Sequence, residues 1–84
     1  MNNKITFCSH PDIIDHTNCY AIKNYDNNTI KFILNNVEQD ASFYLINEND
    51  SNEWLISVMK HSKIIFDCSI TSLDKIKQIC QKKH

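Results

Sequence analysis

Apolar residues follow two patterns along the chain: some recur with the period of a helix, and others form short continuous runs. Three segments place apolar residues at the i, i+3, i+4, i+7 spacing of a helix that buries one face, which predicts helices over 27–38, 51–61 and 72–83. Each segment follows a residue that suits a helix amino terminus. The candidate caps are Asp26, Asn27 or Asn28 for the first helix, Asp50 (with Glu53 three residues later) for the second, and Thr71 or Ser72 for the third. The expected buried stripes are Ile30, Ile33, Leu34 and Val37; Trp54, Leu55, Val58 and Met59; and Leu73, Ile76, Ile79 and Cys80.

Short runs of β-branched and aromatic residues separate the predicted helices, and these runs predict strands. The clearest are 42–47 and 63–68, and both are almost continuously apolar, which is typical of strands covered on both faces. Two weaker runs, 4–8 and 19–23, predict further strands near the start of the chain. Trp54 could anchor a protein interface together with Tyr44 or Phe43, but the pattern favours a core residue packed on the sheet.

Strand and helix alternate from residue 19 onward, which favours right-handed crossovers and a parallel sheet. We therefore expect one α/β domain over 1–84, with a three- to four-stranded, mainly parallel sheet and about three helices. The order resembles a truncated flavodoxin-like or other Rossmann-like arrangement, a resemblance of fold that does not fix function. The segment 9–18 is near the lower limit for a parallel crossover, so the first two strands are either parallel or a hairpin.

Two residue types are missing from the composition, and their absence excludes common sites. The chain has no Gly and no Arg, so a glycine-rich phosphate loop of standard form and an arginine fork are both excluded. Left-handed turn positions must then be filled by Asn or Asp, and the 11 Asn can supply them. Asn, Ile and Lys make 33 of 84 residues, which indicates an AT-rich coding sequence of the kind found in phages, small-genome bacteria and some parasites.

Charge and hydropathy narrow the expected partners. The net charge of −1 gives no overall attraction to nucleic acid or to an anionic membrane. The lysines near the end, at positions 75, 77, 82 and 83, lack Arg and interleaved aromatic residues, so we expect a solvated helix face and no nucleic-acid partner. No apolar run is long enough to cross a bilayer and no signal peptide is visible, so we expect a cytoplasmic protein whose four Cys are reduced thiols.

Polar side chains follow the predicted strands, at the edge where parallel sheets bind ligands. This rim is net acidic, which suits a polar ligand or a cation, and Asp67 is its leading residue because it ends an apolar strand. The alternative is that these residues only cap helices and solvate loops. The candidate ligand-binding residues are His10, Asn47, Asp50, Asp67 and Ser69.

Two further candidates involve cysteine. Cys8, His10, His16 and Cys19 supply two thiols and two imidazoles within twelve residues, which could hold a structural zinc, although only the second half of the spacing resembles common ligand spacing. Cys68 precedes the third helix, where a thiol pKa can be lowered, and so is a candidate nucleophile. In each case the alternative is a small buried side chain.

No combination of these residues specifies a reaction, so we assign no catalytic residue. The first hypothesis is a non-enzymatic protein-interaction or assembly module, consistent with a phage protein, that acts as a homodimer or through a host protein. Small size, a thin core and possible exposed sheet edges favour it. The alternatives are a small ligand-binding protein or enzyme that uses the acidic rim, and a zinc-stabilised domain; no other cofactor is expected.

Overall fold

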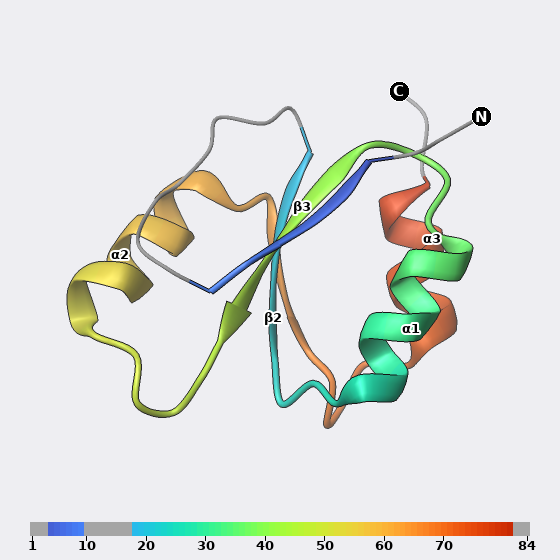
Figure 1. The fold of residues 1–84 in the computed structure, drawn as a ribbon. Helices are drawn as coiled ribbons and strands as arrows, with labels where there is room; N and C mark the ends of the chain where they lie inside the picture. Colours follow the sequence, from blue (N-terminus) through green and yellow to red (C-terminus); the bar gives the residue numbers. More distant parts are fainter. Residues whose placement is uncertain (1–3, 10–17, 82–84) are drawn as a thin grey trace.

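Four parallel strands form one sheet with helices on both faces, as the sequence predicts (Figure 1). The computed structural model describes residues 4–9 and 18–81. Within them the sheet order is β1-β3-β2-β4, which confirms a small α/β fold with a parallel sheet and three helices. The elements are β1 (Ile5–Cys8), β2 (Cys19–Lys23), α1 (Asn27–Asn36), β3 (Ala41–Ile46), α2 (Asn52–His61), β4 (Ile64–Asp67) and α3 (Leu73–Cys80).

The first two strands are parallel but are not neighbours, because β3 lies between them. Ile5 of β1 is opposite Ala41 of β3, and Cys19 of β2 is opposite Ser42 of the same strand. The hairpin alternative is therefore wrong. A hairpin pairs consecutive strands, whereas here β3, which has the most apolar sequence, takes the inner position between β1 and β2.

The helices divide between the two faces, with α1 and α3 side by side on one and α2 on the other (Figure 1). This division follows from handedness. The chain moves from β2 to β3 in one direction along the sheet and from β3 past β2 to β4 in the other, so right-handed crossovers must lie on opposite faces. The loops after β2 and β3 consequently leave toward different faces, which makes the carboxyl ends of these neighbouring strands a topological switch point.

The core beneath α1 and α3 is organised around aromatic rings from all four strands. Phe43 of β3 is fully buried, and its ring centroid lies 5.4 Å from that of Tyr20 on β2 and 5.7 Å from that of Phe7 on β1. Tyr20 in turn lies 5.9 Å from Phe66 on β4. Offset or tilted rings at such separations attract one another beyond simple area burial, so this row ties the strands together from one edge of the sheet to the other.

The opposite face carries a smaller core under α2. Trp54 is only 3% exposed and meets Tyr44 edge-on, with ring centroids 5.8 Å apart and planes at 81°. Val58, one helical turn later, is fully buried in the same cluster, together with Cys19 and Ala21 of β2. The prediction that Trp54 is a core residue is confirmed.

The predicted amino-terminal caps are correct for two of the helices and wrong for the remaining one. Asp26 caps α1, since its Oδ1 accepts a hydrogen bond from the Thr29 backbone at 2.9 Å, and Ser72 caps α3. The cap of α2 is Ser51, not Asp50, because the Ser51 hydroxyl accepts from the Trp54 backbone at 3.2 Å. Asp50 instead accepts from the Asn47 backbone, one turn before the helix.

Strand β4 lies at the edge of the sheet, which contradicts the prediction that 63–68 is covered on both faces. Ile64 and Ile65 are 39% and 43% exposed, whereas Ala41–Tyr44 of the central strand are buried. Two expected buried helix residues are exposed as well: Leu34 at 52% and Met59 at 66%. A helix that packs on a sheet buries only a narrow stripe of its surface, and the side chains of Leu34 and Met59 lie outside that stripe.

Candidate functional site

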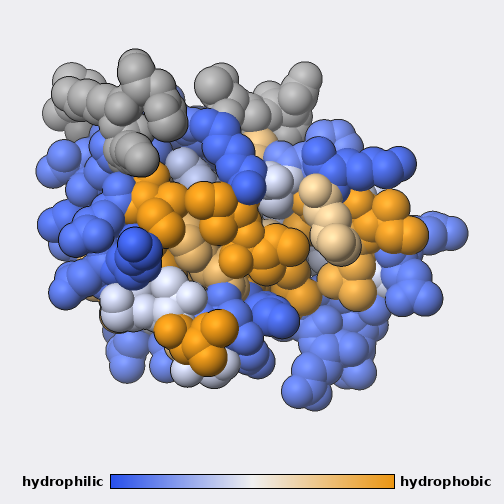
Figure 2. Space-filling view, turned by 180° about the vertical axis from the view of Figure 1, so that it is seen from behind, coloured by the Kyte–Doolittle hydropathy of each residue, from blue (hydrophilic) through white to orange (hydrophobic). Residues whose placement is uncertain are grey.

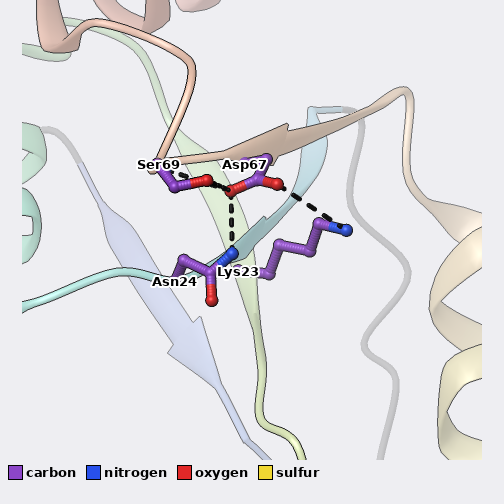
Figure 3. A network of polar contacts seen from close by, with 4 residues as sticks. All are labelled: Lys23, Asn24, Asp67 and Ser69. Carbon is purple, nitrogen blue, oxygen red and sulfur yellow. Dashed lines mark hydrogen bonds and ion pairs between the residues drawn. The ribbon is translucent and has the colours of Figure 1, made fainter.

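A polar network joins the carboxyl ends of β2 and β4, and it is centred on Asp67 (Figure 3). Asp67 Oδ1 accepts hydrogen bonds from the Asn24 side-chain amide at 2.8 Å, the Ser69 backbone at 3.0 Å and the Ser69 hydroxyl at 2.6 Å. The second oxygen, Oδ2, lies 3.8 Å from the ammonium nitrogen of Lys23. Four donor groups therefore converge on one carboxylate at the end of an edge strand.

These contacts favour the ionised form of Asp67. Hydrogen bonds from Asn24 and then Ser69, with a smaller contribution from the Lys23 charge, lower the pKa of the carboxyl from 3.8 to about 2. A general acid or base works best with a pKa near the operating pH, so Asp67 is poorly suited to either role near neutrality. The geometry makes it an acceptor that fixes the turn between β4 and α3.

Asn24 adopts the left-handed backbone conformation, with a φ of 56°. This conformation usually requires Gly, and Asn is among the few other residues that tolerate it. The prediction that Asn fills such positions in a chain without Gly is confirmed here. The turn aims the Asn24 amide at Asp67, so backbone conformation and network depend on the same residue.

A second polar group spans the switch point between β2 and β3. The Tyr25 hydroxyl, from the loop after β2, donates to Asn47 Oδ1 at 2.8 Å in the loop after β3. The Asn47 backbone donates to Asp50 Oδ2 at 2.7 Å, and the Asp50 backbone donates back to the Asn47 carbonyl at 3.1 Å. The polar side chains at this position therefore bind one another and hold the two loops together.

The structure brings the predicted rim residues together in two pairs. Asp67 contacts Ser69, and Asn47 contacts Asp50. The two pairs are connected through consecutive residues, because Asn24 donates to Asp67 and Tyr25 donates to Asn47. His10 lies outside the described residues. Sequence reasoning missed the contributions of Lys23 and Tyr25. Their position at the end of β2 was the available signal, because a parallel sheet brings all strand ends to one edge.

Cys68 lacks the property that a nucleophile requires. Burial is the main reason that the pKa of its thiol is raised, and the nearby Asp67 and Asp26 carboxylates raise it further against a lowering contact with Thr29. The lowered pKa expected from its place before α3 is therefore wrong. Burial and two negative charges outweigh the helix terminus, and the thiol is protonated near neutrality.

The described half of the candidate zinc site consists of Cys8 and Cys19. Both lie on the α2 face, on either side of β3, and burial followed by the proximity of Cys19 raises the pKa of the Cys8 thiol. His10 and His16 lie outside the described residues. Within 4–9 and 18–81, no three His, Cys, Asp or Glu side chains are grouped to hold a metal. Zinc stays a prediction, which metal analysis of protein purified without chelator would test.

Most of the exposed large hydrophobic side chains fall in one stretch of the sequence, which includes β4. Six large hydrophobic residues are exposed in the described part of the chain, and five of them lie between positions 56 and 70. Figure 2, which faces the β4 edge, shows a band of hydrophobic surface across the middle of the molecule. We call this region the β4 edge surface. It comprises Ile64 and Ile65 of β4 and Ile70 of the loop that follows the strand.

Comparison with known protein families, with characterised proteins and with solved structures finds no match for this chain. Among the described residues, none of the helices combines the length and the apolar character that a membrane span requires.

Proposed function

We propose that this chain is a non-enzymatic assembly module that binds another protein chain through the β4 edge surface. One observation carries the proposal. The sequence of β4 is that of a strand covered on both faces, but β4 lies at a sheet edge with Ile64 and Ile65 exposed. A partner that pairs with this edge would give the strand the covered environment that its composition suits.

Edge strands have a direct physical means of binding. Among the described residues, no strand neighbours the outer side of β4, so an extended segment of another chain can complete the backbone donors and acceptors on that side. Exposed apolar residues on both sides of the strand would add burial at roughly 25 cal/mol per Å². Natural sheets commonly blunt such edges with charges or proline, whereas the first three of the four residues of β4 are Ile64, Ile65 and Phe66.

The polar rim supports the same proposal. Asp67 Oδ1 accepts hydrogen bonds from Asn24 and Ser69, Oδ2 lies 3.8 Å from Lys23 Nζ, and the Tyr25 hydroxyl donates to Asn47. These contacts stabilise the loops at the carboxyl end of the sheet. We therefore assign the rim a structural role, in which it holds the end of β4 in place for a partner.

Site-specific photocrosslinking tests the proposal. A benzophenone amino acid replaces Ile65 in one variant and Leu34 in the other, and both are irradiated in the cells from which the sequence derives. Leu34 is the matched control because it is a similarly exposed aliphatic residue, 52% against 43%, on α1. We expect one defined adduct from position 65 and none from position 34. Equal labelling from both positions, or no adduct from position 65, would refute the proposal.

A further inference from the structure

We propose that the partner of the β4 edge surface is a second copy of this chain, paired antiparallel about a two-fold axis at Ile65. This inference rests on the proposed function and names the partner. The result would be a continuous eight-stranded sheet, twice the four strands of one copy, with β4 at its centre. A two-fold arrangement uses the same surface on both copies, so the strand must be complementary to itself.

The charges that flank β4 provide this complementarity. Lys63 precedes the strand and Asp67 ends it, with three apolar residues between them. Pairing about Ile65 places Lys63 of one copy opposite Asp67 of the other, twice per dimer. Opposite charges facing each other across strands are stabilising, and like charges are destabilising. Pairing about Ile64 or Phe66 would shift both charges away from each other, so charge selects one register.

The apolar residues fit the same register. Ile65 is opposite Ala21 of β2, which lies in the core under α2, so the two copies of Ile65 would meet on the α2 face. Ile64 is opposite Tyr20, which belongs to the core under α1 and α3, and would pack beside Phe66 of the other copy. Both exposed isoleucines would thus be buried, each on its own face.

The contacts within one copy leave room for this pairing. The three hydrogen bonds that residues of 4–9 and 18–81 make to the Asp67 carboxylate all reach Oδ1, whereas Oδ2 makes the longer 3.8 Å approach to Lys23. Lys63 Nζ donates to Asn18 Oδ1 at 2.8 Å on the exposed surface, and an ammonium has three donors. Asp67 Oδ2 and the Lys63 ammonium group can therefore each take part in an ion pair with the other copy.

Cysteine self-crosslinking tests the register directly. In the proposed pairing Ile65 faces its own copy, so Ile65→Cys should form an interchain disulfide under mild oxidation. Ile64→Cys is the matched control, since the two residues are adjacent and similarly exposed, but two copies of residue 64 would be roughly 7–8 Å apart on the diagonal. We expect most of the Ile65→Cys protein, and little of the Ile64→Cys or wild-type protein, to become covalent dimer. Equal crosslinking at both positions, or preference for position 64, would overturn the register.

Charge reversal tests the partner. By sedimentation at low salt, Lys63→Glu should weaken self-association about tenfold, because it sets two pairs of like charges opposite each other. Asp67→Lys should do the same, and mixing the two variants should restore a heterodimer of wild-type affinity. Circular dichroism checks folding; if Asp67→Lys fails to fold, Lys63→Glu compared with Lys63→Gln carries the test. An unchanged association constant in Lys63→Glu would overturn the role of the charges.

The two proposals fail in different ways. A chain that stays monomeric at about 1 mM, where even weak association is populated, yet crosslinks through position 65 to a different protein in cells, would refute the homodimer and leave the assembly function intact. A chain that is monomeric and yields no adduct at position 65 would refute both.

Discussion

The side-chain amide of Asn24 donates a hydrogen bond to Oδ1 of Asp67 over 2.8 Å, and so ties the exit of β2 to the exit of β4. The donor sits on a left-handed backbone, with φ at 56°. A residue at this position must therefore satisfy two requirements, a conformation open mainly to Gly and Asn and an amide that reaches the carboxylate. These requirements can be separated by substitution.

Replacing Asn24 should destabilise the protein more with Ala than with Gly. Both substitutions remove the amide donor, but only Ala keeps a Cβ that conflicts with the left-handed conformation, at a cost of about 1–2 kcal/mol. Urea unfolding of Asn24→Ala and Asn24→Gly compares their free energies of unfolding. If Asn24→Ala is as stable as Asn24→Gly, the left-handed turn does not constrain this position.

The lowered pKa of Asp67 predicts an acid-sensitive fold. The folded protein binds this proton more weakly than the unfolded chain does, with a pKa of about 2 against 3.8. Ionised Asp67 therefore stabilises the fold fully above about pH 4, and this contribution is lost as the pH falls toward 2. Asp67→Asn should be less stable near neutrality and should lose less stability between pH 4 and 2. Urea unfolding across this range measures how the free energy of unfolding depends on pH, and Glu48→Gln on an exposed loop is the control. Identical slopes for wild type and Asp67→Asn would contradict the prediction.

The hydrogen bond from Tyr25 to Asn47 should couple the two loops at the switch point. Tyr25→Phe removes the hydroxyl and keeps the ring, so it should lower the free energy of unfolding by about 0.5–1.5 kcal/mol. A double-mutant cycle with Asn47→Ala isolates the pair: in that background Tyr25→Phe should have almost no further effect. Additive losses would show that the hydroxyl stabilises the protein through some other contact.

Element type and order followed from the sequence because hydrophobic period and cap chemistry are local properties. Phe43 and Tyr44 predicted a strand buried on both faces, and both are fully buried in β3. The same reasoning failed for β4, since an apolar run specifies extended structure and a need for cover but not whether the same copy provides it. Strand order depends on crossover direction, which no short window of sequence encodes.

The polar rim could be predicted only in part, for a related reason. Asp67 and Ser69 are two residues apart, so their contact is a local turn that composition suggests. Asn24 reaches Asp67 across 43 positions, and Tyr25 reaches Asn47 across 22. Such pairs appear only once the register of neighbouring strands is known. The prediction of a lowered pKa for Cys68 failed for the same reason. The burial that raises this pKa and the carboxylates near the thiol depend on contacts between separate elements.

Two isoleucines should contribute very differently to the free energy of unfolding, because one lies in the core and the other on the β4 edge surface. Ile76 of α3 is fully buried in the larger core, whereas Ile70, in the loop after β4, is 84% exposed. Truncation of a buried Ile removes transfer energy and leaves a cavity, so Ile76→Ala should lower the free energy of unfolding by about 2–5 kcal/mol. Ile70→Ala should change it by less than about 0.5 kcal/mol.

The measurement is urea unfolding of both variants at a protein concentration low enough to keep the chain monomeric, because association would add stability to the folded state. At this concentration the same Ile→Ala change compares the two environments without a contribution from a partner. A loss at Ile70 as large as that at Ile76 would mean that the loop after β4 packs against the core of its own copy. The β4 edge surface would then be smaller than the exposed side chains indicate.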